Sequence, residues 1–572
     1  MGIVFHCPIF IMKRLSILLL LALCLTGIAT AQPKWAKKAQ RSVFTVKTFN
    51  ANGSLKASVT GFFTGTAGEA VSILSAFTGA SKAIVIDSHG KEWPVTSILG
   101  ADSNYDVIKF RVSARQCPAL TIAATVPSVQ TAVWLLPYSP KKLKTCTLGK
   151  VSKIETVKDS LPYYTLDIQA PDGSMGCPVL NDNGEVAGIF QPTGQDVPNT
   201  GYAVSIMLAN NLKTNGLSIN DAALKAIGIK KELPADLNQA LLTLYLAGTA
   251  LDSTRTKEYS SLVNDFIQQF PTAPDGYISR AQLAAAQGEY ARADKDMNEA
   301  LGLEEKKDNT HYCYARLILQ KIILDKDSAY QAWTLDKAAD EAQAAYDLNP
   351  LPVYLQLKSQ IRCTQKKYDE AYTILQSLIA QGHKEADIYC QASQCKELLG
   401  DTALALALLD SAVATFSKPW LKAAAPYILA RAQAQMRAGN YRVAYSDFND
   451  YEQLMPTEVG AQFYYLRAQA AIGGRMFQQA LNDYNKAIAK QPNNTLYYAE
   501  KASLEIRVNL LTQAIDTAKA CISIAPEQSD GYLLLGLAQC LSGNKVQGKA
   551  NLKKAQDLGD NQADDLIKQY AQ

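Results

Sequence analysis

The chain has 572 residues, of which 48% are hydrophobic and 19% charged, and its formal net charge is +4. One hydrophobic core does not organise a chain of this length, so two or more domains are expected, and the composition is that of a folded protein rather than a disordered segment. The small net charge gives no support to a nucleic-acid partner, which would show as Lys and Arg clustered on one face.

Residues 1–31 have the pattern of a secretory signal peptide. A basic patch at residues 13–14 precedes the apolar run LSILLLLALCL, and Ala29 and Ala31 are the small residues placed for cleavage. Met12 is the predicted start, because the segment ahead of it interrupts this order. We expect export to the periplasm or the exterior of a bacterial cell. A membrane anchor is the rival interpretation, for which the apolar run is short, and we expect no integral membrane span in the mature chain.

The eleven cysteines do not form the pattern of a disulfide framework, because removing Cys7 and Cys24 with the leader leaves nine, an odd and scattered set. Leu23 ahead of Cys24 is larger than a lipoprotein signal tolerates. Cys390 and Cys395 are close in sequence, but no histidine accompanies them as a zinc site would require. We interpret most cysteines as small core residues, and we predict no metal and no cofactor.

Residues 42–205 have the periodicity of an all-β region. Short β-branched and aromatic segments alternate with turn signals such as ANG, SHG and NDNG; they are SVFTVKTF, AIVID, DVIKFRV, TAVWLLP, EVAGIF and GYAVSI. This spacing predicts a sandwich or a pair of barrels. Two helical segments follow, and KKELPAD is typical of a domain boundary near residue 231.

Several motifs of this region resemble those of trypsin-like serine proteases, especially the bacterial exported proteases of the high-temperature-requirement type. They are TGFF, VSILSAF, DSNYDVIKF, GSMGCPVLNDNGEVAGIF and GYAVSI, which stand in the family's order over residues 40–206. The resemblance implies an all-β double barrel over residues 36–230, with a cleft built around a His-Asp-Ser triad.

Carried over motif by motif, the resemblance places the triad positions at Ser75, Asp106 and Met175, which are 31 and 69 residues apart. A thioether has no proton to lose, and a hydroxyl is not basic near neutral pH, so this set lacks the nucleophile and the base. The resemblance therefore implies an inactive homologue in which Asp106 is a satisfied polar residue beneath Ser75. Gly173 and Gly176 still suit the turn of an oxyanion hole, so a cleft that holds a peptide without cleaving it is also expected.

The alternative is an active peptidase that uses Cys177 as a displaced nucleophile, because thiolates are strong nucleophiles. Ser174 is one place early, and we expect its side chain to point away from the site. The mature chain has three histidines, His89, His311 and His383, and we expect none of them beside Cys177.

Beyond residue 237 the periodicity becomes helical and the sequence repeats. A small residue recurs at intervals of 33 to 45 residues, at Ala293, Ala338, Ala371, Ala405, Ala444, Ala480, Ala514 and Gly548. This pattern resembles the tetratricopeptide repeat family, whose units are pairs of helices of about 34 residues. The signature residues that carry the resemblance are Tyr277, Gly288, Tyr290, Ala293, Gly439, Tyr441, Ala444, Pro456, Tyr464, Ala480, Pro492, Tyr498, Ala514, Pro526 and Tyr532.

The resemblance implies an all-α solenoid of eight or nine repeats over residues 239–562, followed by a tail at 563–572. Such arrays bind a peptide or a helix of another protein on their concave face. We expect Tyr464 to pack between repeats, and Tyr465 and Arg467 are candidate groove residues. The predicted function is an exported pseudoprotease scaffold that binds proteins through the array, and through the cleft as well. A weaker hypothesis gives all binding to the repeats and makes the β half a rigid cap.

Overall fold

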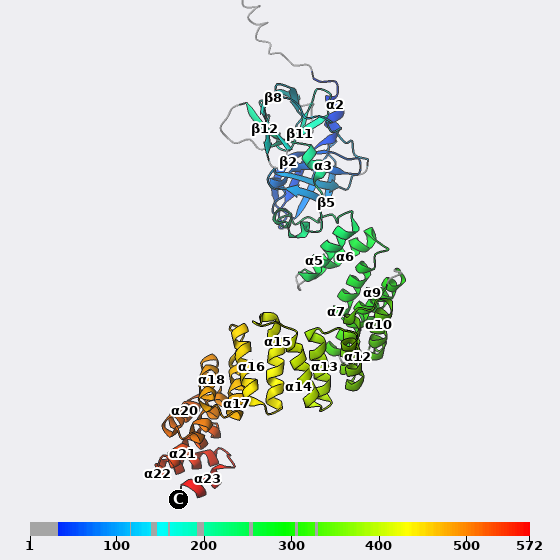
Figure 1. Ribbon diagram of the computed structural model, residues 1–572. Helices are drawn as coiled ribbons and strands as arrows, with labels where there is room; N and C mark the ends of the chain where they lie inside the picture. The colour runs from blue at the N-terminus through cyan, green and yellow to red at the C-terminus, as the bar shows by residue number, and fades with distance from the viewer. Residues whose placement is uncertain are drawn as a thin grey trace, which may run out of the picture. The chain divides into compact units, whose positions relative to one another are not determined.

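The computed structural model describes residues 32–114, 116–138, 146–157, 161–191, 199–250, 255–303, 307–325 and 330–571. The predicted signal peptide lies outside the described residues. Contacts divide the chain into two compact units, one ending at Arg280 and one beginning at Ala281 (Figure 1). The predicted domain limits at residues 230 and 239 stay predictions.

Two closed six-stranded barrels make up most of the first unit, with strand orders β1-β2-β3-β6-β5-β4 and β10-β11-β12-β9-β8-β7. Neighbouring strands run antiparallel. The strands of the first barrel are β1 (Val43–Phe49), β2 (Leu55–Phe63), β3 (Glu69–Ile73), β4 (Lys82–Ile86), β5 (Glu92–Asp102) and β6 (Val107–Val112), and those of the second are β7 (Ala132–Leu135), β8 (Thr147–Val157), β9 (Leu161–Asp167), β10 (Pro178–Leu180), β11 (Val186–Gln191) and β12 (Thr200–Ser205). The predicted pair of barrels is confirmed.

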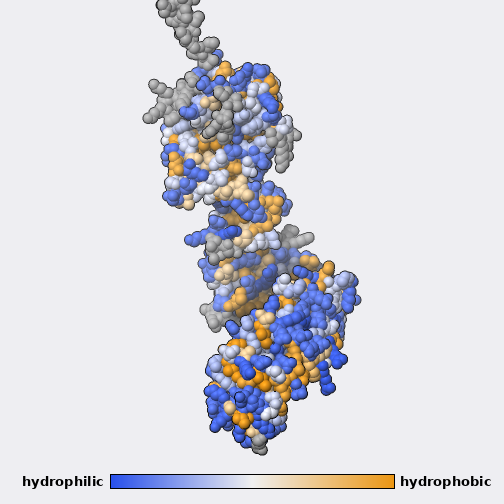
Figure 2. Space-filling model, turned by 90° about the vertical axis from the view of Figure 1, so that its left-hand side faces the viewer, coloured by the Kyte–Doolittle hydropathy of each residue, from blue (hydrophilic) through white to orange (hydrophobic). Residues whose placement is uncertain are grey.

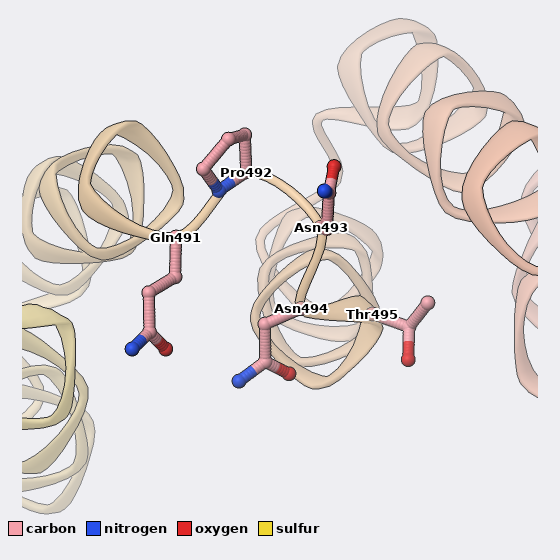
Figure 3. A pocket seen from close by; sticks show the side chains of 5 residues that line it. All are labelled: Gln491, Pro492, Asn493, Asn494 and Thr495. Carbon is pink, nitrogen blue, oxygen red and sulfur yellow. The ribbon is translucent and has the colours of Figure 1, made fainter.

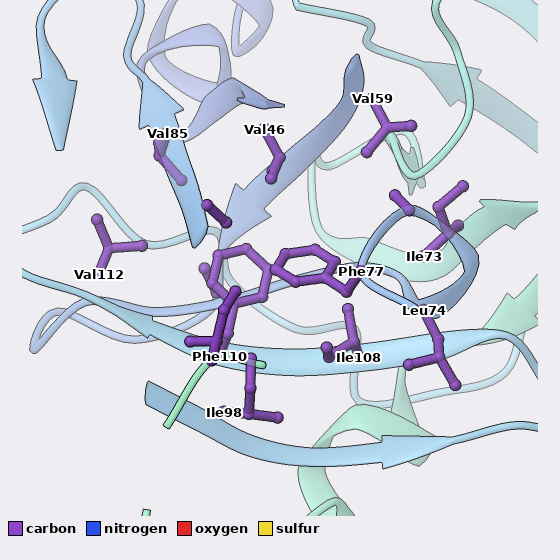
Figure 4. Packing of buried hydrophobic residues seen from close by; sticks show 14 of the residues in the cluster. Val46, Val59, Ile73, Leu74, Phe77, Val85, Ile98, Ile108, Phe110 and Val112 are labelled. Carbon is purple, nitrogen blue, oxygen red and sulfur yellow. The ribbon is translucent and has the colours of Figure 1, made fainter. Parts of the chain in front are cut away.

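Aromatic side chains fill the interior of the first barrel, as Figure 4 shows around Phe77 and Phe110. Their rings are 5.0 Å apart, and those of Phe44 and Phe63 are 4.6 Å apart. Because side chains alternate between the two faces of a strand, the period-two pattern of the sequence places one side of each strand in this core.

The segment after the second barrel returns to the first one. The helices α2 (Ala36–Ala39), α3 (Met207–Asn211) and α4 (Ala222–Lys225) border the barrels, and Leu224, Ile227 and Ile229 belong to the core of the first. The N–H of Ile98 on β5 donates to the carbonyl of Lys230 at 2.8 Å. The sequence around residue 231 therefore pairs with β5 before α5 (Leu237–Thr249) and α6 (Thr256–Gln269) begin.

Helices alone form the rest of the chain described by the structure, and from α8 to α23 each helix contacts the next. They are α7 (Pro274–Ala286), α8 (Tyr290–Leu303), α9 (Asp308–Leu324), α10 (Leu335–Leu348), α11 (Pro352–Thr364), α12 (Tyr368–Ala380), α13 (Ala386–Leu398), α14 (Thr402–Ala414), α15 (Ala425–Arg437), α16 (Tyr441–Leu454), α17 (Ala461–Gly473), α18 (Phe477–Lys490), α19 (Thr495–Arg507), α20 (Leu511–Ile524), α21 (Ser529–Leu541), α22 (Lys545–Asp557) and α23 (Ala563–Tyr570). This arrangement confirms the predicted all-α solenoid, and α23 occupies most of the predicted tail.

The recurring small residues lie where paired helices approach most closely. Ala371 is fully buried, and its carbonyl accepts a hydrogen bond from the Ser359 hydroxyl at 3.0 Å. One repeat later the Ser393 hydroxyl donates in the same way to the carbonyl of Ala405 at 2.7 Å. A larger side chain at these places would hold the helices apart, which explains the residue type.

The surface of the helical unit mixes hydrophilic and hydrophobic residues on the face seen in Figure 2. Among the described residues, no helix has both the length and the apolar character that a bilayer span requires.

Candidate functional site

The β3–β6 pairing brings together Ser75 and Asp106, two of the positions that the resemblance assigns to the triad. Ser75 lies in the short 3-10 helix η2 (Leu74–Ala76) that follows β3, and Asp106 directly precedes β6. Because Ile73 is opposite Val107 in the sheet, the chain that leaves β3 through Leu74 and Ser75 runs beside Asp106, and the N–H of Leu74 donates to the Asp106 carbonyl.

Ser75 donates a hydrogen bond to each oxygen of the Asp106 carboxylate. Its backbone N–H donates to Oδ1 at 2.6 Å, and its hydroxyl donates to Oδ2 at 2.8 Å. The backbone carbonyl of Asp106 accepts from the N–H of Leu74 at 3.1 Å, and Asp106 has a left-handed φ of 50°. The carboxylate thus fixes the short helix to the turn between β5 and β6.

The turn before β10 carries Met175, which is 41% exposed. Strand β2 of the first barrel holds this turn through Thr60, whose hydroxyl donates to the carbonyl of Gly173 at 2.7 Å and whose N–H donates to the carbonyl of Met175 at 3.0 Å. Gly176 has a φ of 80°, and a Cβ there would lie 2.3 Å from the carbonyl oxygen of Thr60. Only glycine fits this close approach.

The same turn leaves two backbone donors open. Among the described residues, the N–H groups of Gly173 and Met175 have no hydrogen-bond acceptor. A Cβ at Gly173 would meet no atom within 4 Å, so the turn faces open space there. Paired N–H groups of this kind can bind a peptide carbonyl oxygen.

The side chains of Cys177 and Ser174 are turned into the protein. Cys177 is completely buried in the core of the second barrel with Tyr164 and Leu166, and burial raises the pKa of its thiol. The hydroxyl of Ser174 donates to the carbonyl of Pro171 at 2.6 Å. Neither side chain is presented to a substrate.

Within the described part of the first unit, no histidine is beside Asp106. His89 lies in the turn between β4 and β5, at the opposite end of the eleven-residue strand β5. A strand of that length spans roughly 30 Å. His311 and His383 belong to the second unit. The part of the chain that the structure describes also contains no group of three or more His, Cys, Asp or Glu side chains that could hold a metal ion.

Two tyrosines near Asp106 escaped the sequence analysis. Tyr163 on β9 and Tyr202 on β12 stack with ring centroids 6.2 Å apart. Burial raises the pKa of Tyr163, and the neighbouring Tyr202 and Asp106 raise it further. The pairing of β9 with β12, in which Val204 is opposite Tyr163, brings these rings together. The two adjacent tyrosines of LPYYTLD, whose side chains lie on opposite faces of β9, were the available signal.

The signature residues of the repeats lie at the turns and on the buried faces of the helices. Gly288 and Gly439 have left-handed φ values of 77° and 79° in turns. The signature tyrosines belong to helices: Tyr290 and Tyr441 are the first residues of theirs, and Tyr277, Tyr464, Tyr498 and Tyr532 lie further inside. The signature prolines come just after the ends of α16, α18 and α20; they are Pro456, Pro492 and Pro526. Ala293, Ala444, Ala480 and Ala514 are completely buried.

Arg467, one of the two candidate groove residues, is buried inside the array. It is 2% exposed, and its guanidinium donates to both oxygens of Asp483, at 3.0 and 2.6 Å. Burial raises the pKa of Asp483, and Arg467 opposes that rise. Tyr464 is buried as expected, and its hydroxyl donates to Glu452 at 2.9 Å. The ring of Tyr465 is 5.6 Å from that of Tyr497.

A groove of about 450 Å³ lies between α7, α8 and α9. Its lining includes Gln282, Tyr290, Arg316, Gln320 and Lys321. Arg316 lies over the ring of Tyr312, 5.6 Å from its centroid, and forms no salt bridge with any described residue. The groove therefore offers an unpaired cation together with amide side chains.

A second hollow of about 500 Å³ lies over the turn between α18 and α19. Figure 3 shows that Pro492 points away from Gln491 and Asn494. The five lining residues are consecutive, the last of them being Thr495 at the start of α19, so the hollow is lined by a single stretch of chain.

Comparison with known proteins matches residues 59–189 to the family model of the trypsin-like peptidase domain. The chain is 29% identical over 125 residues to the small glutamine-rich tetratricopeptide repeat-containing protein 2 of Saccharomyces cerevisiae, covering 22% of this chain and 36% of that protein. It is 27% identical over 92 residues to the TPR repeat-containing thioredoxin of Arabidopsis thaliana, covering 16% and 24%. The chain thus spans little more than a third of these relatives, or less.

Solved structures similar to the chain include a protease from M. tuberculosis in its active form, at 17% identity and a TM-score of 0.29, covering 35% of this chain and 87% of that one. Another is the serine endoprotease from Yersinia pestis, at 20% identity and a TM-score of 0.28, covering 32% and 65%. From the family match and the fold, this chain has a trypsin-like peptidase domain followed by a tetratricopeptide-like helical array.

Proposed function

We propose that this protein is an exported, non-catalytic scaffold in which a trypsin-like domain without peptidase activity is joined to a helical array that binds other proteins in the cell envelope. The observation that carries the proposal is the state of the Asp106 carboxylate, which accepts both hydrogen bonds from Ser75. In the triad mechanism this carboxylate orients an imidazole. Here it orients a hydroxyl and a peptide N–H.

The chemistry at the third position supports the same proposal. Acyl transfer requires a nucleophile that loses a proton to a nearby base. Met175 has no such proton, and the nearest described histidine in the domain, His89, is at the far end of β5. The open N–H groups of Gly173 and Met175 and the stacked pair of tyrosines still suit the holding of an extended peptide.

The helical groove at α7–α9 is the proposed binding face of the array. Arg316 and Lys321 give it positive charge, and the glutamines provide donors and acceptors for a peptide backbone. An acidic peptide segment fits this lining best. Arg316→Glu should weaken partner capture at least tenfold, whereas Tyr202→Ala tests the cleft. If only the cleft variant loses the partner, the array is not the binding face.

A fluorophosphonate probe and a casein assay test the absence of catalysis. We expect no labelling and no cleavage above the level of heat-denatured protein, with trypsin as the positive control. Labelling or hydrolysis that persists in Met175→Ala would refute the proposal, because a nucleophile would then exist elsewhere in the chain.

The active-peptidase alternative requires a reactive Cys177, and its burial argues against it. It predicts hydrolysis that iodoacetamide blocks and that Cys177→Ser abolishes. Export is tested separately by cell fractionation, with the protein expected in the periplasm or the medium. Recovery of a full-length chain with its leader in the cytoplasm would contradict export and leave the question of catalysis open.

A further inference from the structure

Two cysteines from neighbouring repeats lie in direct contact in the helical unit. Cys363, near the end of α11, and Cys395, near the end of α13, have their sulfur atoms 3.2 Å apart. They are 32 residues apart in sequence, close to one repeat, so the stacking of successive repeats brings them together. Cys390, which is closer in sequence to Cys395, has no sulfur partner among the described residues.

The surroundings of the two thiols differ. Cys395 is completely enclosed in an apolar cluster with Leu355, Leu375 and Ala392, whereas Cys363 is only half-buried. The hydrogen bond from Cys395 lowers the pKa of the Cys363 thiol, and the same contact together with burial raises the pKa of Cys395. The accessible thiol is therefore the one that ionises first, which is the order that thiol–disulfide exchange requires.

We propose that Cys363 and Cys395 form a disulfide that joins the first helices of two adjacent repeats. The oxidant is a disulfide compound, either of low molecular mass or of a protein. The Cys363 thiolate attacks one sulfur of the oxidant, forms a mixed disulfide and releases one thiolate. Cys395 then gives its proton to solvent and attacks the Cys363 sulfur, and the second thiolate leaves. Two cysteines are oxidised, one disulfide is reduced to two thiols, and the sulfur atoms close from 3.2 Å to a bond of about 2.05 Å.

The bond would fix the spacing of two repeats. The helix α12 lies between α11 and α13 in the chain and contacts both, so a covalent link at the ends of α11 and α13 closes this three-helix unit. A cross-link that closes a loop stabilises the folded state by restricting the unfolded chain. Oxidation should therefore raise the temperature at which this part of the array unfolds.

Oxidised glutathione is the probe for this site. The purified protein is oxidised under native conditions, alkylated after unfolding, and digested for mass spectrometry. We expect the loss of two alkylatable thiols and a peptide that links Cys363 to Cys395. Cys390→Ser is the matched control, because it changes a cysteine on the same helix and should retain the link. A folded protein that keeps all its thiols, or that links Cys395 to a cysteine other than Cys363, overturns the proposal.

The order of attack has its own test. In Cys395→Ser, glutathione should remain on Cys363 as a trapped mixed disulfide, whereas in Cys363→Ser the buried Cys395 should stay unmodified while the circular dichroism of the array is unchanged. Glutathione on Cys395 in folded Cys363→Ser refutes this order. If Cys395→Ser does not fold, the change in unfolding temperature on oxidation still tests whether the disulfide forms. The unfolding midpoint of the wild type should rise on oxidation and fall back with reductant, and that of Cys363→Ser should show neither change.

Discussion

The role of Asp106 as a structural acceptor makes a quantitative prediction. A hydrogen bond to a charged group contributes about 1.5–3 kcal/mol, and solvent exposure at Ser75 favours the lower end. Asp106→Ala loses two such bonds and also places alanine at a left-handed φ of 50°, which costs about 1 kcal/mol more. We expect a loss of about 4 kcal/mol. Asp106→Asn should lose about 1 kcal/mol, because asparagine tolerates this φ and keeps one acceptor. Ser75→Ala, which keeps the backbone bond and loses the hydroxyl bond, should lose about 1.5 kcal/mol.

Alkylation across a urea gradient measures these losses within the intact chain. Cys117 lies in the core of the first barrel and Cys521 in the helical unit, and both are buried. Each thiol is labelled only when its own unit opens, so mass spectrometry of the two peptides separates the transitions. The urea midpoint of Cys117 labelling should be lowered slightly by Ser75→Ala and more strongly by Asp106→Ala. The midpoint of Cys521 labelling should not move.

Equal midpoints for Asp106→Ala and Ser75→Ala would refute this reasoning, because they would mean that the carboxylate does not hold the short helix. A shift of the Cys521 midpoint would mean that the substitution acts on the whole chain, and the magnitude could then not be assigned to the two hydrogen bonds.

Four further variants test the turn, the repeats and the chemistry of the site. Gly176→Ala should cost about 3 kcal/mol or prevent folding, whereas Gly173→Ala, with the same φ but open space, should cost about 1 kcal/mol; urea unfolding with alkylation distinguishes them. Asp483→Ala leaves a buried arginine without its bidentate partner and should lose about 3–5 kcal/mol in the helical unit, measured by circular dichroism. Ser75→His combined with Met175→Ser restores a base and a nucleophile and should create fluorophosphonate labelling; a folded double variant without labelling would show that the turn cannot stabilise an acyl intermediate.

The sequence predicted the fold well where the signals are local or periodic. Alternating apolar residues between Gly-rich turns fix each strand, and the recurring alanines fix the closest approach of paired helices. The sequence was less informative where a residue's partner is not its neighbour in sequence. Arg467 is charged and therefore suggested exposure, but Asp483, sixteen residues later, lies against it in space. Arg431 and Asp447 pair in the same way with the same separation, so the spacing itself was a readable signal.

The cysteines show the same limit. Proximity in sequence drew attention to Cys390 and Cys395, which lie on one helix, whereas the sulfur contact joins residues one repeat apart. A repeat array places residue i near residues about one period away, so a pair of thiols separated by roughly 34 residues is a better candidate than a pair separated by five. Tyr163 and Tyr202 were missed for a related reason, because their contact depends on strand register.

At the candidate site, the groups that stabilise the barrel differ from the groups that catalysis would need. The fold uses the backbone at both Ser75 and Met175: the N–H of Ser75 donates to Asp106, and the carbonyl of Met175 accepts from Thr60. Chemistry would use their side chains, and that of Met175 is 41% exposed. Gly176 is different, because a Cβ at this position would collide with the carbonyl oxygen of Thr60. A substitution at 175 can therefore remove a nucleophile at little cost to stability, and a match to the motif around it indicates the barrel rather than the reaction.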